Sequence, residues 1–288
     1  MLHWFPGHMH KARKELIKII PQVDIVFEVV DARAPEASAN PVLQEIAQDK
    51  PIIKILNKSD LSTPDVTQQW LKFYKNKAIA LNIPSEKKLP EKLLILAEKF
   101  VPNRGTTLKP IRAVIIGIPN VGKSTLMNKL AGKKIAKTGN EPAITKQQQN
   151  ILITRKFYLR DTPGIMTPSP KCEDSAYRLA ILGAIRDTAM DYPSAAYYLL
   201  RYLIIDHSSY LCERFNLIKD DLLKPESILL EKIAIKIGAI KNDAEINLHQ
   251  ASEKLILDFR SGRMGKISLE TPAVYLAEKE NQKTEPSE

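Results

Sequence analysis

The segment Gly117–Ser124, which reads GIPNVGKS, combines two glycines, a lysine and a serine at fixed spacing. It fits the pattern G-x-x-x-x-G-K-[ST] directly after an apolar β-branched run and before a helical pattern. In that setting the glycines let backbone N–H groups curl around phosphates, and the helix N-terminus adds partial positive charge. We therefore expect Lys123 to act in catalysis by reaching the β- and γ-phosphates of a nucleotide, and the Ser124 hydroxyl to ligate Mg²⁺. The nucleotide contacts expected within this loop are Pro119, Asn120, Val121, Gly122, Lys123, Ser124 and Thr125.

A second motif, Asn57-Lys58-Ser59-Asp60, bears on the choice of base, because it fits N-K-x-D at the end of an apolar run. A carboxylate at Asp60 accepts hydrogen bonds from N1–H and the 2-amino group of guanine. Adenine offers an acceptor at N1 and no 2-amino group, so a desolvated Asp60 facing it costs on the order of a few kcal/mol. Together with the phosphate loop, this motif predicts GTP and GDP as ligands, contacted by Asn57, Lys58 and Asp60.

A third motif, Asp161-Thr162-Pro163-Gly164, fits D-x-x-G downstream of the phosphate loop. We expect Asp161 to hold Mg²⁺ through water and the Gly164 N–H to bind the γ-phosphate. Between the two motifs, Thr145 lies in a polar segment, 138–149, that is typical of a switch region. Thr145 is therefore the candidate for the second Mg²⁺ hydroxyl and for a catalytic role, and an ordinary loop threonine is the alternative.

The order of these motifs is unusual, because N-K-x-D precedes the phosphate loop and no comparable motif follows Gly164. Joining the old termini and opening the chain at another surface loop produces this order and leaves the sheet intact. The segment 84–110 would be the new connection. The opening then falls after D-x-x-G, so we expect loss of the γ-phosphate to move the carboxy-terminal helices through the switch.

Apolar runs alternate with helical patterns through the first part of the chain, which predicts a mostly parallel sheet covered on both faces. After Pro170 only helical periodicity remains. The expected fold is an α/β P-loop GTPase domain with circularly permuted motif order, residues 1–167, followed by a small all-α domain, 168–277. A polar tail, 278–288, is expected to be disordered. The runs expected to be strands are 23–30, 51–56, 78–83, 111–116 and 151–159, and the later helical patterns are 173–191, 194–205, 226–237 and 244–261.

The net charge of +10 is concentrated in one half of the chain. Residues 1–165 hold 27 Lys and Arg against 14 Asp and Glu, whereas 166–288 hold 16 against 19. This basic half favours a polyanionic partner such as RNA; lysine drift in an AT-rich genome is the alternative. No apolar run is long enough to cross a bilayer, no signal peptide is present, and the two cysteines lack metal-ligand spacing. We therefore expect a cytoplasmic protein without membrane contact.

The motif set as a whole resembles the bacterial ribosome-biogenesis GTPase A family, circularly permuted GTPases of the YlqF/YawG type that serve late large-subunit assembly. The resemblance covers about residues 1–272. Besides the three motifs above, the matching stretches are Trp4-Phe5-Pro6-Gly7-His8-Met9, Val29-Val30-Asp31-Ala32-Arg33, Arg178-Leu179-Ala180-Ile181-Leu182-Gly183 and Asp258-Phe259-Arg260-Ser261-Gly262-Arg263.

The resemblance implies the partner and several roles. The partner is the precursor of the large ribosomal subunit with its rRNA, and we expect a monomer whose slow GTP hydrolysis is accelerated there. Position 165 is Ile, which cannot orient water, and the resemblance points to His8 as the catalytic group; a histidine that merely starts a helix is the alternative. Asn120 resembles an asparagine that recruits K⁺, with a loop-stabilising amide as the alternative. The expected rRNA contacts are Lys254, Arg260, Arg263 and Lys266.

Two departures from the family pattern affect the site. Ala143 stands where the family usually has Gly, and 79–85 lacks the Ser-Ala pattern of the last guanine-contacting loop, which leaves the backbone around Asn82 as the candidate. Three other functions compete with the ribosomal one. They are a GTP-operated switch acting on a protein partner, a tRNA-modification GTPase, which the motif order disfavours, and an ATP-dependent kinase, which the guanine motif disfavours.

Overall fold

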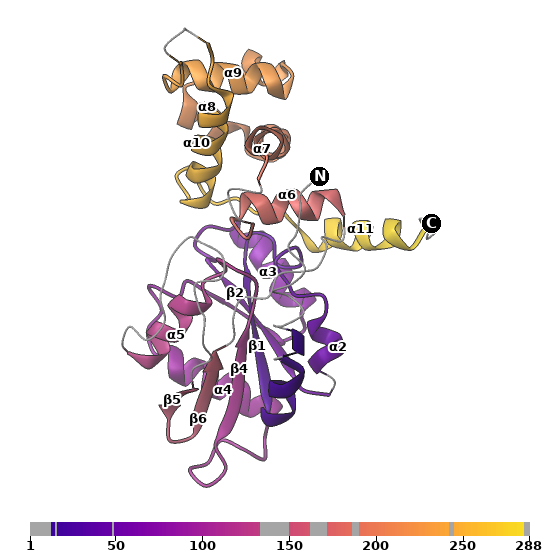
Figure 1. The fold of residues 1–288 in the computed structure, drawn as a ribbon, viewed down its shortest axis with the longest axis vertical. Helices are drawn as coiled ribbons and strands as arrows, with labels where there is room; N and C mark the ends of the chain where they lie inside the picture. The colour runs from indigo at the N-terminus through magenta and orange to yellow at the C-terminus, as the bar shows by residue number, and fades with distance from the viewer. Residues whose placement is uncertain are drawn as a thin grey trace.

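A six-stranded sheet with the order β3-β2-β1-β4-β6-β5 forms the centre of the lower part of the molecule (Figure 1). The computed structural model describes residues 13–14, 16–47, 49–132, 150–161, 172–185, 190–241 and 245–284. All strand pairs are parallel except the one between β5 and β6 at the edge. The strands are β1 (Ile25–Asp31), β2 (Ile52–Asn57), β3 (Ala78–Leu81), β4 (Ile111–Ile116), β5 (Asn150–Thr154) and β6 (Phe157–Asp161). The mostly parallel sheet expected from the sequence is confirmed.

Helices cover both faces of this sheet, which explains why β1 is apolar at every position except Glu28 and the terminal Asp31. Every residue of β1 is buried, as expected of a parallel strand with no solvent-facing side. Ile25, Phe27 and Val29 pack on one face against α4 (Leu89–Phe100) and α5 (Lys123–Ala131). On the other face Val26 packs against α2 (Leu43–Ala47) and the helical residues 16–19, which a 3₁₀ turn, η1 (Ile20–Gln22), ends. Helix α3 (Pro64–Phe73) covers the carboxyl ends of β1 and β2 through Trp70.

Five helices stand beyond the carboxyl edge of the sheet (Figure 1). Their apolar faces join the core that α4 and α5 form with the sheet. The expected helix 173–191 ends at Ile181, because Gly183 takes a left-handed φ of 77° and terminates it. The last of the five begins at Leu248 because the Asn247 side chain accepts from the Gln250 N–H as an N-cap. The helices are α6 (Glu173–Ile181), α7 (Tyr192–Asp206), α8 (Ser208–Phe215), α9 (Glu226–Lys236) and α10 (Leu248–Arg260), with a 3₁₀ turn η3 (Lys219–Leu223).

The chain then returns to the sheet domain and ends in α11 (Pro272–Thr284). Tyr275 of this helix packs against Trp70 and Phe73 of α3, and the Trp70 Nε1–H donates to the Glu270 carbonyl at 3.1 Å. The expectation of disorder from residue 278 onward does not hold for 278–284, which are helical. A buried partner explains this order, because Glu278 accepts two hydrogen bonds from the Arg178 guanidinium, at 2.7 and 3.0 Å. Among the residues that the structure describes, none of the helices combines the length and the apolar composition needed to cross a bilayer.

A buried carboxylate, Glu270, sits where α11 approaches the sheet domain. It accepts from the backbone N–H groups of Glu36 at 2.7 Å and Ala37 at 3.2 Å, and lies 3.6 Å from the Arg178 guanidinium. Burial raises the pKa of Glu270 to about 7, although Arg178 and the two N–H groups oppose the shift. The carboxylate also borders a cavity of about 690 Å³, which is lined by none of the nucleotide-site residues expected from the sequence.

This raised pKa predicts that stability falls as pH rises. The ordinary value is 4.5, so between about pH 4.5 and about pH 7 the folded protein holds a proton that the unfolded chain has released. The free energy of unfolding should therefore decrease through that window by about 3 kcal/mol. Urea denaturation at pH 5 and pH 8 measures it. Glu270→Gln should flatten the dependence, whereas Glu253→Gln, at an exposed position of α10, should keep it; an unchanged slope in Glu270→Gln contradicts the assignment.

Candidate nucleotide-binding site

The phosphate loop lies between β4 and α5, at the carboxyl edge of the sheet, and both of its glycines are required by close approaches. A Cβ on Gly117 would lie 2.5 Å from the Val29 carbonyl oxygen. Gly122 has a φ of 99°, and a Cβ there would lie 2.2 Å from the Asn57 side-chain amide. Any larger residue would push the loop away from the sheet or from the guanine motif. The pattern G-x-x-x-x-G thus reflects packing as well as space for phosphate.

Lys123 begins α5, and its side chain is folded back over the phosphate loop. The residue is 8% exposed, and Nζ donates to the Ile118 carbonyl at 3.0 Å. Its ammonium therefore lies against the backbone that is expected to surround the phosphates. Ser124 follows in the first turn of α5, where helix N–H groups point toward the loop.

Two of the residues expected to hold Mg²⁺, Ser124 and Asp161, follow or end the neighbouring strands β4 and β6. Asp161 ends β6, which pairs with β4, and Asp161 stands beside Ile115 in that register. Ser124 follows β4 across the phosphate loop. A serine hydroxyl and a carboxylate are oxygen ligands suited to Mg²⁺, so this donor set fits the ion. For Asp161 only the backbone position is described.

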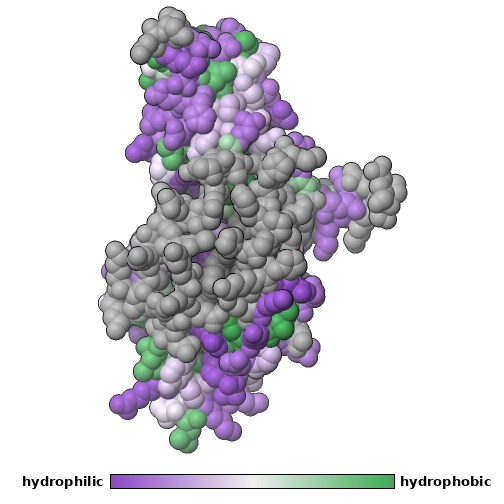
Figure 2. Space-filling view, viewed as in Figure 1, coloured by the Kyte–Doolittle hydropathy of each residue, from purple (hydrophilic) through white to green (hydrophobic). Residues whose placement is uncertain are grey.

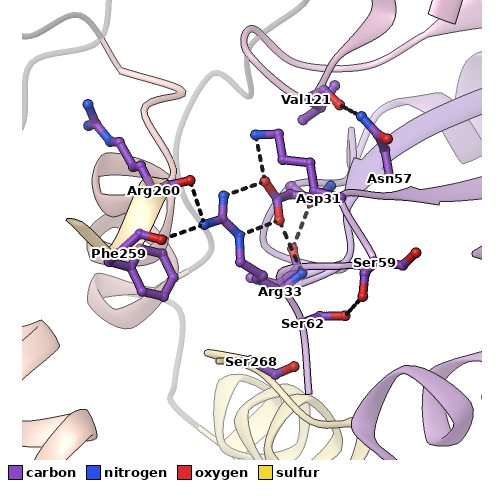
Figure 3. A network of polar contacts seen from close by, with 12 residues as sticks. Asp31, Arg33, Asn57, Ser59, Ser62, Val121, Phe259, Arg260 and Ser268 are labelled. Carbon is purple, nitrogen blue, oxygen red and sulfur yellow. Dashed lines mark hydrogen bonds and ion pairs between the residues drawn. The ribbon is translucent and has the colours of Figure 1, made fainter. Parts of the chain in front are cut away.

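The guanine motif is joined to the phosphate loop by two side-chain hydrogen bonds. The Asn57 amide donates to the Val121 carbonyl at 2.7 Å, and the Lys58 ammonium donates to the Asn120 carbonyl at 3.0 Å (Figure 3 shows the first). Asn57 is 3% exposed, whereas Asp60 at the end of the motif is exposed. The carboxylate expected to recognise guanine is thus open to a ligand, while the residues before it fix the motif to the loop.

The loop after β3 lies next to the guanine motif, where the sequence analysis expects the last base contact. The Ser59 N–H donates to the Leu81 carbonyl at 3.2 Å, which fixes the start of that loop beside residue 59. On its far side, the Lys129 ammonium of α5 donates to the Pro84 carbonyl at 2.9 Å. The backbone around Asn82 therefore lies between the guanine motif and α5, and its contact with a base stays a prediction.

Asp31 and Arg33 form a buried ion pair that contacts Lys58, and neither residue was assigned a role from the sequence. Arg33 donates to both Asp31 carboxylate oxygens at 2.9 Å (Figure 3). The Lys58 ammonium lies 2.9 Å from one of these oxygens. Asp31 and Arg33 are each 1% exposed. Burial alone would raise the pKa of Asp31, but Arg33 and Lys58 hold it well below its usual range. The signal available in the sequence was a pair of opposite charges, Asp31 and Arg33, at the end of a mostly apolar run.

Asn120 connects the phosphate loop to the helical domain. Its backbone is left-handed, with a φ of 62°, and its side-chain Nδ2 donates to the Gly183 carbonyl at 2.6 Å. Gly183 follows α6, so the amide joins the loop to the end of that helix.

The basic cluster expected to contact rRNA is organised around one buried carboxylate, Asp258, which has no exposed surface. It pairs with Arg263 at 3.1 Å, with Lys254 at 3.3 Å and with Arg214 of α8 at 2.6 Å. Lys266 is exposed nearby in the chain. Arg214, more than 40 positions before Asp258 in the sequence, was missed because nothing local marks it as a neighbour. On the face shown in Figure 2, these uppermost helices expose mainly hydrophilic side chains.

Arg260 does not join this cluster, and its contact with rRNA stays a prediction. Its Nε donates to the Ile181 carbonyl and its Nη2 to the Ala180 carbonyl, both at 2.8 Å. The last carbonyls of a helix lack intrahelical partners, and a guanidinium near that end satisfies them. Arg260 is therefore a cap for α6.

Four residues of the sequence-based site cannot be placed in the same way. His8, Thr145 and Gly164 lie outside the described residues, and the side chain of Asp161 does as well. Their roles stay predictions.

A phosphate loop interlocked with a guanine motif that precedes it in the chain defines a P-loop GTPase of the circularly permuted class. Residues 112–196 match the family model described as "50S ribosome-binding GTPase". The "Ribosome biogenesis GTPase A" of Priestia megaterium is 40% identical over 94% of this chain and 97% of its own length, and that of Thermotoga maritima is 28% identical over 94% and 95%. The solved GNP-bound YlqF from T. maritima superimposes with a TM-score of 0.65 at 25% identity, covering 91% of this chain and 98% of its own. The chain belongs to the ribosome biogenesis GTPase A family.

Proposed function

We propose that this protein is a cytoplasmic assembly factor for the large ribosomal subunit that binds GTP and hydrolyses it to GDP and phosphate when docked on the pre-ribosome. The proposal that the protein binds GTP rests on the hydrogen bond from the Asn57 amide to the Val121 carbonyl. This bond fixes the guanine motif next to the phosphate loop, so that one nucleotide can contact both. The ribosomal part rests on the names of the relatives and of the family model. The protein acts as a monomer with rRNA as its contact.

Hydrolysis proceeds by in-line attack of water on the γ-phosphate. Lys123 and the loop N–H groups stabilise charge that develops on the phosphate oxygens, and the Gly164 N–H adds to them. When bound, Mg²⁺ neutralises part of this charge, and Ser124, Thr145 and Asp161 would hold it. The residue after D-x-x-G is Ile165, which cannot orient the attacking water as a glutamine at this position would. His8 orients the water instead.

A role for Asn120 in K⁺ binding would use its amide oxygen, since its nitrogen donates to the Gly183 carbonyl. This contact also supports the simpler alternative, a loop-stabilising amide. Both would be sensitive to Asn120→Ser, but only the first makes hydrolysis depend on the identity of the monovalent cation.

The test is GTP hydrolysis with and without purified large subunits, in K⁺ and in Na⁺ buffers. Stimulation by subunits that disappears in His8→Ala supports the assembly function and the role of His8 together. Fast turnover that ignores subunits would contradict the ribosomal part and favour the second candidate, a switch acting on a protein partner. Turnover that is equal in both buffers would remove K⁺ from the mechanism.

Lys254 and Arg263 are predicted to contact rRNA phosphates. Removing both in Lys254→Ala/Arg263→Ala should weaken binding to large subunits and lower the slope of log affinity against log salt by about 1.4 to 1.8, since each phosphate contact contributes roughly 0.7 to 0.9. Co-sedimentation at several salt concentrations measures the slope. Lys236→Ala, at an exposed position of α9 outside the cluster, is the control. An unchanged slope in the double variant would refute this surface.

A further inference from the structure

The guanine motif is connected to the helical domain by a chain of buried contacts that begins at Lys58. Its ammonium lies 2.9 Å from Asp31, whose carboxylate is held by the Arg33 guanidinium at 2.9 Å on each oxygen. The same guanidinium donates to the Phe259 carbonyl at 3.2 Å and lies over the Phe259 ring, 4.7 Å from its centre (Figure 3). It also reaches the Arg260 carbonyl at 3.5 Å. Lys58, Asp31 and Arg33 thus connect the guanine motif to the carboxyl end of α10.

A second connection leaves the phosphate loop and reaches the same place. Asn120 accepts from Lys58 through its backbone carbonyl and donates to the Gly183 carbonyl through its side chain. Gly183 ends α6, and the preceding carbonyls of Ala180 and Ile181 accept from the Arg260 side chain. The two connections therefore close a ring: guanine motif, α10, the end of α6, phosphate loop and back to Lys58.

We infer that Arg33 is a positioning residue that couples guanine-nucleotide binding to the placement of α10, and with it the helical domain. The inference rests on the nucleotide-binding part of the proposed function. Arg33 would transmit the effect of nucleotide binding to α10 through the guanine motif. This coupling is separate from the switch region, which is expected to respond to the γ-phosphate. GDP therefore suffices to engage it.

Burial makes this coupling stiff. Asp31 and Arg33 are almost fully excluded from water, and one carboxylate is shared by two cations, Arg33 and Lys58. The Lys58 ammonium is also held by its hydrogen bond to the Asn120 carbonyl at 3.0 Å. If Lys58 moves, no water can take its place beside the buried Asp31 carboxylate. The Arg33 guanidinium must therefore shift instead, and its remaining N–H groups donate to carbonyls of α10. Ordering the phosphate loop and Lys58 with a nucleotide therefore also orders the end of α10.

Amide hydrogen exchange of the full chain, with and without GDP and Mg²⁺, tests this coupling. GDP should slow exchange in the phosphate loop and, by about fivefold or more, in residues 258–265. In Arg33→Lys the effect at 258–265 should shrink to less than about twofold, because an ammonium cannot serve both Asp31 oxygens and the α10 carbonyl together. Protection of the phosphate loop should remain. A purely structural role for Arg33 would change exchange at 258–265 equally with and without GDP.

Tyr202→Phe is the matched control, because it removes a hydrogen bond from α7 to the Ser268 carbonyl that is outside the ring. It should keep the GDP effect at 258–265. If Arg33→Lys does not fold, Arg33→Met serves as the test variant. In Arg33→Met the Asp31 carboxylate stays paired with Lys58. A full GDP effect in the Arg33 variant, or none in the unmodified protein, overturns the coupling. Absence of protection in the phosphate loop itself would instead overturn the nucleotide-binding proposal, and the coupling with it.

Discussion

Replacing Lys123 with methionine is expected to lower GTP turnover about a thousandfold, which corresponds to about 4 kcal/mol of transition-state stabilisation. The ammonium is the only charge that the phosphate loop itself contributes, and it lies against the loop at the Ile118 carbonyl. Charge grows on the phosphate oxygens as the γ-phosphate leaves, and methionine cannot compensate it. Single-turnover release of phosphate on large ribosomal subunits measures the loss.

The fold should not suffer from this change. Lys123 is 8% exposed, and methionine matches the apolar stem of the side chain as far as Cε while removing a buried charge. Lys129→Met, on the same helix, is the matched control, since its ammonium donates to the Pro84 carbonyl away from the phosphate loop. Turnover in the control should stay near that of the unmodified protein. A loss of less than tenfold in Lys123→Met would show that the ammonium is not a catalytic group.

The sheet and the position of the site could be predicted because the signals are local. The wholly buried strand β1 is marked by a mostly apolar run that only Glu28 interrupts before Asp31, and the phosphate loop and guanine motif each follow a mostly apolar run as well. Parallel strands end at one edge of a sheet, so two motifs that each follow such a strand lie at the same edge. The hydrogen bond between the Asn57 amide and the Val121 carbonyl joins the two motifs at this edge.

The function of individual cations could not be predicted, because it depends on which distant element lies opposite. Arg260 and Arg263 are three positions apart in one basic cluster of the sequence. Arg260 faces the end of α6 and caps it, whereas Arg263 remains 61% exposed beside Asp258. Nothing between residues 254 and 266 indicates that the carbonyls of α6, about 80 positions earlier, need a donor there.

The order of the chain's last helix also could not be predicted from the sequence, because it depends on distant contacts. Residues 278–288 are polar, and composition alone indicates a disordered tail. Helix α11 continues to Thr284 because Tyr275 packs on α3 and Glu278 meets Arg178, a buried guanidinium that its own neighbours in sequence do not neutralise. A polar segment is ordered when a buried charge elsewhere requires its carboxylate, and only the folded structure reveals that requirement.

Asp60→Asn should exchange the base preference of the site, with GDP affinity falling about a thousandfold, or about 4 kcal/mol. Asp60 is exposed at the end of a motif whose first two residues are fixed to the phosphate loop, so the substitution changes recognition and leaves the register intact. An asparagine presents an N–H to the 2-amino group of guanine, and two donors then face each other. Xanthine carries a carbonyl oxygen at that position, which accepts from the amide.

Competition of GDP and of xanthosine diphosphate against a fluorescent guanine nucleotide on the unmodified protein, and direct titration of both on the variant, measure this exchange. Asp65→Asn, at an exposed position in the first turn of α3, should bind GDP like the unmodified protein. If Asp60→Asn loses GDP without gaining xanthosine diphosphate, the carboxylate shapes the loop and does not contact the base. If it loses neither, base recognition lies in the loop after β3, and the backbone around Asn82 becomes its main determinant.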